Sequence, residues 1–292
     1  MLRVPSSDGV VVAVHEFGGD PASPPLLISH ATGFHAHCYE PVASRLADHF
    51  RVYGLDYRGH GQTAAPDGWQ VDWGRFGDDA LAAARAVAPD GGLVGVGHSM
   101  GGAALLMAAH RDPTRFDRLV LFEPIAIPET APRVPMDEHP IVVGARRRRR
   151  VFDSYDDAIE NFRDKLPLSV MTPAVLCAYV EHGFRPLVAA DGEPAGVELI
   201  CSADIEAGIF TASRDNGVWE LLPEITTPTT VVTGYIDEQQ PSGRCADIAA
   251  RLPSSRYLFL PYQSHLGPFS HPEELADLVL AELGSEPISR TP

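Results

Sequence analysis

The strongest constraint on this chain is a glycine–serine motif set between a strand and a helix. The motif Gly-His-Ser-Met-Gly at residues 97–101 follows an apolar run at 93–96 and precedes an alanine- and leucine-rich run at 103–110. A strand that turns directly into a helix leaves no room for side chains beside the turn, which explains the two glycines. Ser99 would then hold a strained backbone conformation, with its hydroxyl clear of the sheet at the start of the helix. This context favours a nucleophilic serine over an ordinary glycine–serine turn.

Composition narrows the class of protein. The chain has 292 residues, 45% of them hydrophobic, which allows one large domain or a core with an inserted segment. Acidic residues outnumber Lys and Arg by 39 to 23, for a formal net charge of −16. This balance argues against nucleic acid or an anionic membrane as the main partner. The four cysteines are scattered, and neither a signal peptide nor a membrane span is recognisable, so we expect a cytoplasmic protein with reduced thiols.

Strand and helix patterns alternate along most of the chain, which predicts a mostly parallel sheet covered by helices on both faces. Strands are expected at 2–4, 10–17, 26–29, 51–55, 93–96, 119–122, 229–233 and 257–260, and helices at 41–47, 73–87, 103–110, 242–252 and 272–283.

The alternation stops after the sixth of these strands. Residues 128–224 begin with a proline-punctuated link and then show helical patterns at 158–166 and 173–182. We therefore expect a core of residues 1–127 and 225–283, interrupted by a mainly helical cap at 128–224. The polar residues 284–292 are predicted to form a flexible tail.

Five short motifs in this order resemble the α/β-hydrolase fold over nearly the whole chain. They are residues 30–33 (His-Ala-Thr-Gly), 56–61 (Asp-Tyr-Arg-Gly-His-Gly), 97–101, 234–237 (Gly-Tyr-Ile-Asp) and 264–265 (Ser-His). The resemblance implies a serine hydrolase that needs no cofactor, with the inserted cap over its substrate pocket. It also implies that residues 56–61 are a structural turn below the site.

The resemblance implies a catalytic triad in the order nucleophile, acid, base. Ser99 takes the place of the nucleophile and His265, just before the last helix, that of the base. Asp237 is the favoured acid because it closes a Gly-x-x-Asp turn after a late strand. Glu123 is the alternative acid; it also follows a strand, but Pro124 should hold it in an extended conformation.

The oxyanion of an acyl-transfer reaction needs two backbone N–H donors. The resemblance assigns these to Met100, which follows the nucleophile, and to Thr32, in the loop after the third strand. Ala31 stands where the family usually has glycine, so Gly33 is the residue expected to supply the backbone freedom of this loop.

Two further clusters of residues resemble binding sites, but a structural role explains each of them more simply. His30, His35 and His37 could suggest a metal site, but His30 already has a structural role in the family pattern, and no metal is expected. The five arginines at 146–150 are expected at the start of a cap helix, balanced by the acidic residues at 153–160 as a solvated charged face. An arginine that steers a carboxylate-bearing substrate is the alternative.

The sequence therefore predicts an esterase that cleaves a small to medium apolar ester through an acyl-enzyme. A carbon–carbon bond hydrolase of the meta-cleavage type shares the Ser-Met-Gly-Gly elbow and the cap, although its glycine-rich oxyanion loop is not matched. A ligand receptor that keeps the fold but turns over slowly is the third hypothesis. The expected partner is a small-molecule substrate, and a homodimer is left open.

Overall fold

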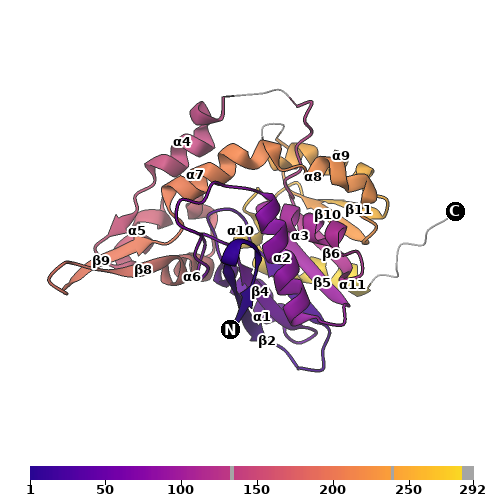
Figure 1. Cartoon of the computed structure of the whole chain (residues 1–292), viewed down its shortest axis with the longest axis horizontal. Coiled ribbons are helices and arrows are strands. Elements are labelled where there is room, and N and C mark those ends of the chain that lie inside the picture. Colours follow the sequence, from indigo (N-terminus) through magenta and orange to yellow (C-terminus); the bar gives the residue numbers. More distant parts are fainter. Residues whose placement is uncertain (132–134, 238–239, 285–292) are drawn as a thin grey trace.

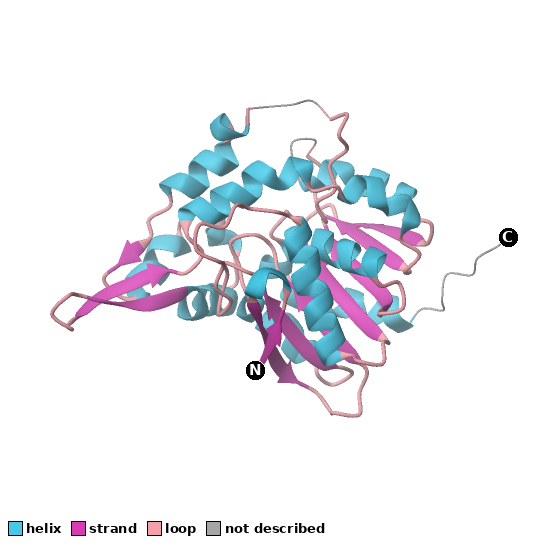
Figure 2. Cartoon of the chain, in the orientation of Figure 1, coloured by secondary structure: helices cyan, strands magenta, loops and turns pink. Residues whose placement is uncertain are grey.

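A twisted eight-stranded sheet forms the centre of the protein (Figures 1 and 2). The computed structural model describes residues 1–131, 135–237 and 240–284. The first two strand pairings are antiparallel and the others are parallel, which confirms the mostly parallel sheet. In spatial order the strands are β1 (Leu2–Pro5), β2 (Val11–Gly18), β4 (Arg51–Asp56), β3 (Pro25–Ser29), β5 (Leu93–His98), β6 (Phe116–Phe122), β10 (Thr229–Thr233) and β11 (Ser255–Phe259).

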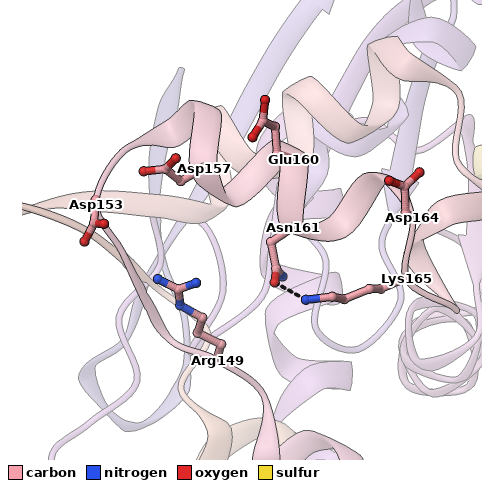
Figure 3. A pocket seen from close by; sticks show the side chains of 7 residues that line it. All are labelled: Arg149, Asp153, Asp157, Glu160, Asn161, Asp164 and Lys165. Carbon is pink, nitrogen blue, oxygen red and sulfur yellow. Dashed lines mark hydrogen bonds between the residues drawn. The ribbon is translucent and has the colours of Figure 1, made fainter.

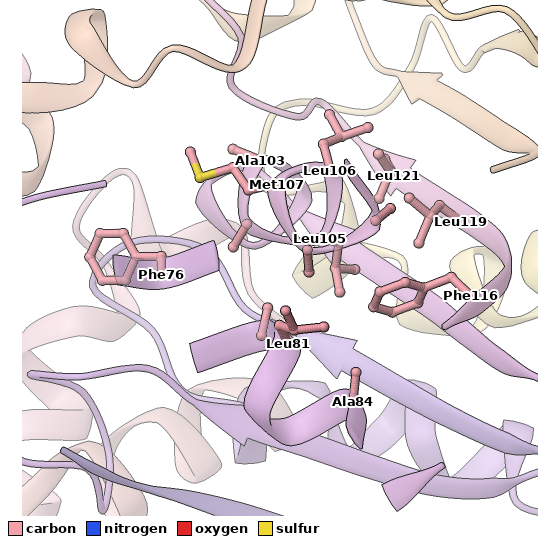
Figure 4. Packing of buried hydrophobic residues seen from close by; sticks show 14 of the residues in the cluster. Phe76, Leu81, Ala84, Ala103, Leu105, Leu106, Met107, Phe116, Leu119 and Leu121 are labelled. Atoms are coloured by element: carbon pink, nitrogen blue, oxygen red, sulfur yellow. The ribbon is translucent and has the colours of Figure 1, made fainter. Parts of the chain in front are cut away.

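Helices cover both faces of this sheet, because its central strands are apolar on both sides. One face carries α2 (Gly74–Val87), α3 (Met100–Arg111), α8 (Val218–Leu221) and α9 (Cys245–Arg251), and the other carries α1 (Glu40–Leu46) and α11 (Pro272–Gly284). Figure 4 shows Leu81 of α2 and Leu105 of α3 in one cluster with Leu119 of β6. The predicted α/β-hydrolase architecture is therefore confirmed.

The segment between β6 and β10 extends from one end of the sheet (Figure 1). We keep the name cap for residues 128–224. The cap contains α4 (Pro140–Arg147), β7 (Val151–Phe152), α5 (Tyr155–Arg163), α6 (Pro173–Gly183), β8 (Phe184–Val188), β9 (Pro194–Leu199) and α7 (Ala203–Ala212). Helices α5 and α6 match the two predicted ones. Helix α8 also belongs to this segment, but its Val218 packs in the core beneath α3.

The sequence predicted neither helices α4 and α7 of the cap nor its three-stranded antiparallel sheet, β7-β9-β8. Strand β7 has only two residues, and β8 and β9 are half exposed with irregular burial along the strand. Such strands lack the clean apolar alternation on which a sequence prediction depends. Most of the predicted tail, residues 285–292, lies outside the described residues.

No helix in the described part of the chain is both long enough and apolar enough to span a bilayer.

The turn at residues 56–61 is a buried polar scaffold, as expected. The fully buried Arg58 guanidinium donates to both carboxylate oxygens of Asp79 at 2.7 and 2.8 Å. Asp56 accepts hydrogen bonds from His15, from the N–H of Ala36 and from the N–H of Gln62. Burial favours the neutral acid, but the hydrogen bond and charge of His15 outweigh it and hold the pKa of Asp56 below its usual value.

Removing one member of the Arg58–Asp79 pair should destabilise the fold strongly. We expect Asp79→Ala to lower the free energy of unfolding by about 3–5 kcal/mol, because it removes the buried two-oxygen partner of the guanidinium and leaves only the 3.2 Å contact with the partly exposed Asp8. Urea denaturation followed by circular dichroism measures this loss. The exposed pair Arg45–Asp277 is the control, and Asp277→Ala should change stability little. Equal losses in the two variants would contradict the structural role of residues 56–61.

Candidate active site

The turn between β5 and α3 has the strained geometry that its sequence predicts. Ser99 has φ 55° and ψ −116°, a region that residues other than glycine rarely occupy. A side chain at position 101 would place its Cβ only 2.2 Å from the carbonyl oxygen of Ser29, and one at position 97 would lie 2.7 Å from the Cα of Gly102. Glycine is therefore required at both positions, and the turn presents Ser99 at the start of α3.

His265 lies on the loop between β11 and α10 (Gly267–Ser270), next to this turn. Its ring centroid is 4.9 Å from that of His98, the residue before Ser99. Its Nδ1 lies 2.6 Å from a carboxylate oxygen of Glu123. A carboxylate can only accept, so Nδ1 carries the proton, and in the neutral imidazole Nε2 is then free to accept one. This is the tautomer that a general base needs.

Glu123 is fully buried at the end of β6, and its carboxylate is held from several sides. One oxygen accepts the N–H of Gly234 at 2.8 Å and the hydroxyl of Thr233 at 3.4 Å, while the other faces His265. The backbone of Glu123 has φ 44°, a second strained position beside Ser99. These bonds offset the cost of burying the carboxylate and keep it aimed at the imidazole.

In the structure the alternative acid, Glu123, holds Nδ1 of His265, which favours Glu123 over Asp237 as the acid. The backbone N–H of Ser99 bonds the carbonyl of Phe122, so the end of β6 is tied to the nucleophile turn. Asp237 follows β10, which lies on the far side of β6 from β5. It is half exposed and its N–H bonds the hydroxyl of Ser242. The extended backbone predicted for Glu123 from the proline that follows it is not observed, since its φ is left-handed at 44°.

The loop after β3 holds the other predicted oxyanion donor, Thr32. The N–H of Ala31 bonds the hydroxyl of Tyr39, and the N–H of Gly33 bonds Nε2 of His60. These bonds fix the peptide planes on either side of Thr32. Gly33 has φ 81°, so it supplies the backbone freedom that Ala31 lacks. Met100 is the first residue of α3, where a backbone N–H has no acceptor within the helix.

Tyr39 links three parts of the site through one chain of hydrogen bonds. Its hydroxyl accepts the N–H of Ala31 and lies 2.8 Å from Nδ1 of His98, whose Nε2 lies 2.8 Å from the carbonyl oxygen of His265. The carbonyl can only accept, so Nε2 of His98 is protonated and Nδ1 accepts from the tyrosine. Every polar group in the chain of bonds is thereby satisfied, and burial lowers the pKa of His98 well below its usual value. No sequence pattern indicated this role for Tyr39.

Tyr39→Phe should therefore impair the site without removing any triad residue. It leaves the N–H of Ala31 without its partner and loosens the oxyanion loop. We expect kcat to fall about tenfold with little change in KM, less than the roughly 100- to 1,000-fold cost of losing a direct oxyanion donor. Tyr57→Phe is the matched control, because this buried tyrosine bonds Ser29 below the nucleophile turn. Equal kcat losses in both variants, measured on the same ester, would argue against this role.

Aromatic side chains surround the oxyanion loop and the base. The Phe34 ring lies 4.5 Å from that of Phe269, on α10 just after His265, and 5.6 Å from that of Tyr179 on α6 of the cap. Tyr39 packs edge-on against Phe269 at 5.0 Å. The polar groups of the site therefore stand among apolar walls supplied by both core and cap.

The arginine run begins at the end of α4, not at the start of a helix as predicted. Arg146 and Arg150 pair with Asp137 and Glu198 on the surface. Arg148 bonds the buried Glu206, whose side chain lies against Gly33 of the oxyanion loop. Arg148, which lies beside the oxyanion loop, therefore already has a carboxylate partner.

Arg149 and the predicted acidic partners of the run line an open, highly charged hollow on the cap (Figure 3). Its lining residues are Arg149, Asp153, Asp157, Glu160, Asn161, Asp164 and Lys165. None of them is a candidate catalytic residue, and Arg149 is the one member of the arginine run in this lining.

Comparison with known proteins agrees with this fold. The sequence profile described as "Alpha/beta hydrolase family" matches residues 26–278. The chain therefore belongs to the alpha/beta hydrolase family, and this membership supports a hydrolytic enzyme.

Individual relatives are more distant. Monoglyceride lipase from Rattus norvegicus is 34% identical over 112 residues, which cover 36% of this chain and 37% of the lipase. Pimeloyl-[acyl-carrier protein] methyl ester esterase from Aeromonas salmonicida is 23% identical over 92% of this chain and 97% of its own length. The solved structure of E-2-(acetamidomethylene)succinate hydrolase superposes with a TM-score of 0.78, covering 98% of this chain and 99% of that one at 20% identity. The first match spans only about a third of the lipase, and the structural likeness shows the fold alone.

Proposed function

We propose that this protein is a serine hydrolase that cleaves carboxylic esters through an acyl-enzyme, with Ser99, His265 and Glu123 as its triad. The observation that carries the proposal is the 2.6 Å contact between Nδ1 of His265 and the buried Glu123, beside the strained Ser99. An imidazole oriented by a carboxylate next to a strained serine turn is the arrangement that activates a serine.

In this mechanism Nε2 of His265 takes the proton of Ser99 as its Oγ attacks the acyl carbon. Glu123 stabilises the imidazolium that forms, because its carboxylate accepts the Nδ1 proton. The N–H groups of Met100 and Thr32 stabilise the negative oxygen of the tetrahedral intermediate. His265 then donates its proton to the leaving alcohol, and a water molecule repeats the sequence to release the acid. No cofactor takes part in these steps.

The aromatic surroundings of the oxyanion loop support a small to medium apolar acyl group. Phe34, which is partly exposed beside the loop, packs on the buried rings of Phe269 and Tyr179. The monoglyceride lipase and methyl ester esterase relatives act, by name, on esters, which is consistent with this class.

A screen of p-nitrophenyl esters of graded acyl length tests the proposal, together with labelling by a fluorophosphonate. We expect stoichiometric labelling and turnover that peaks at a short or medium acyl chain. A meta-cleavage product included in the screen tests the carbon–carbon hydrolase alternative. Labelling without turnover on any ester would favour the receptor hypothesis.

A further inference from the structure

A second cluster of titratable side chains lies away from the triad, where α6 of the cap packs on the segment before α1. His37 lies in a short 3-10 helix (Ala36–Tyr39), Glu40 begins α1, and His182 lies in the last turn of α6. The proposed hydrolytic mechanism uses none of these three residues.

The three side chains offer ligand atoms at close range. Nδ1 of His37 lies 2.5 Å from a carboxylate oxygen of Glu40. The ring of His182 stacks on that of His37 with centroids 3.7 Å apart and planes within 10°. One ligand atom from each of the three residues lies within 4.8 Å of the others.

Two buried residues behind His37, His15 and Asp56, form a second layer of hydrogen bonds around this cluster. Nε2 of His37 lies 3.1 Å from Nδ1 of His15, and Nε2 of His15 lies 2.8 Å from Asp56. A histidine that binds a metal through one ring nitrogen almost always hydrogen-bonds through the other, which fixes its orientation and its basicity. His37 has this arrangement, with its Nδ1 left facing Glu40 and the solvent side.

We propose that His37, Glu40 and His182 form a binding site for a divalent transition metal of the zinc type. Two imidazoles and one carboxylate form a ligand set that zinc accepts, with a fourth position open to water. Zinc bonds of about 2.0–2.2 Å place tetrahedral ligand atoms roughly 3.3 Å apart, so the three groups must draw together, and the His182 ring must turn out of its stack on His37, before both imidazoles can point at one ion. Glu40 can make such a shift because its side chain is 43% exposed.

The bound metal would tie the cap to the core, because His182 belongs to α6 whereas His37 and Glu40 belong to the core. A ligand that binds only the folded chain stabilises it by mass action. The expected consequence is a higher melting temperature in the presence of zinc, independent of hydrolysis at Ser99.

Zinc titration of the metal-free protein tests this site. The chain is prepared without an affinity tag and treated with EDTA; Zn²⁺ binding is then measured by competition with a chromophoric chelator. Co²⁺ serves as a spectroscopic probe of coordination. We expect one Zn²⁺ per chain and visible Co²⁺ bands typical of four-coordination. His182→Ala should weaken Zn²⁺ binding at least about 100-fold and His15→Ala about 10- to 100-fold, since second-layer partners alone are worth that much.

Two control variants and one substitute variant test whether these particular residues bind the metal. His110→Ala removes a histidine that pairs with Glu224 but has no second imidazole in the contact, and it should bind Zn²⁺ like wild type. His182→Gln replaces His182→Ala if the alanine variant does not fold. Ser99→Ala should bind Zn²⁺ unchanged, so failure of the hydrolase proposal would leave this result intact. Wild-type protein that binds no stoichiometric Zn²⁺, or a His182 variant that binds it equally well, would overturn the proposal.

Discussion

Ser99→Ala is expected to lower kcat on a short p-nitrophenyl ester by at least about 1,000-fold, with KM close to that of wild type. Alanine has no oxygen to attack the acyl carbon, so no acyl-enzyme can form. The remaining activity would come from the oxyanion donors and substrate positioning. The same substitution should abolish labelling by the fluorophosphonate, read by intact-protein mass spectrometry.

The control for this experiment is Ser264→Ala, which removes the serine beside His265 in sequence. This variant should be labelled at Ser99 like wild type, because the Ser264 hydroxyl bonds only a local backbone N–H in the described contacts. Undiminished labelling of the Ser99→Ala protein would move the nucleophile elsewhere and remove the basis of the proposed mechanism.

Glu123→Gln is expected to lower kcat by roughly 10⁴-fold, while Asp237→Asn stays within about tenfold of wild type. A glutamine amide can place its NH₂ group against Nδ1 of His265. The imidazole would then carry its proton on Nε2, where it cannot accept the proton of Ser99. Because glutamine has almost the same shape as glutamate, it can still accept the N–H of Gly234, and circular dichroism should show both variants folded.

Glu123→Asp tests whether the negative charge at position 123 supports catalysis or whether the residue has only a structural role. It keeps the negative charge but shortens the side chain, so it should recover part of the activity that Glu123→Gln loses. Collapse of kcat in Asp237→Asn, with Glu123→Gln near wild type, would return the acid to Asp237. The serine-hydrolase proposal would survive that result with a different triad.

The choice between these two acids could not be made from the sequence. Both residues follow apolar strands, and both lie at the same edge of the sheet. The structure favours Glu123, because its carboxylate lies 2.6 Å from Nδ1 of His265. Such a contact between distant segments is a long-range property, and no local pattern in the sequence encodes it. The steric rule for the residue before proline was also overridden, since tertiary hydrogen bonds hold Glu123 at φ 44°.

The cap also has parts that the sequence predicts and parts that it does not. Its interruption of the strand–helix alternation and two of its helices could be predicted, because helical periodicity is local. Its three short strands could not, since β7 and β8 become strands only by pairing with β9.

The sequence by itself determined the strand–helix order, the glycines around Ser99 and the turn that strains it, because these follow from steric contacts and periodicity within a few residues. Only the tertiary structure decided which carboxylate reaches His265, and only it revealed that Tyr39 joins the oxyanion loop to the base. It also brought His182 of the cap to His37. These contacts join residues from separate elements, and their geometry depends on how the whole sheet and cap pack together.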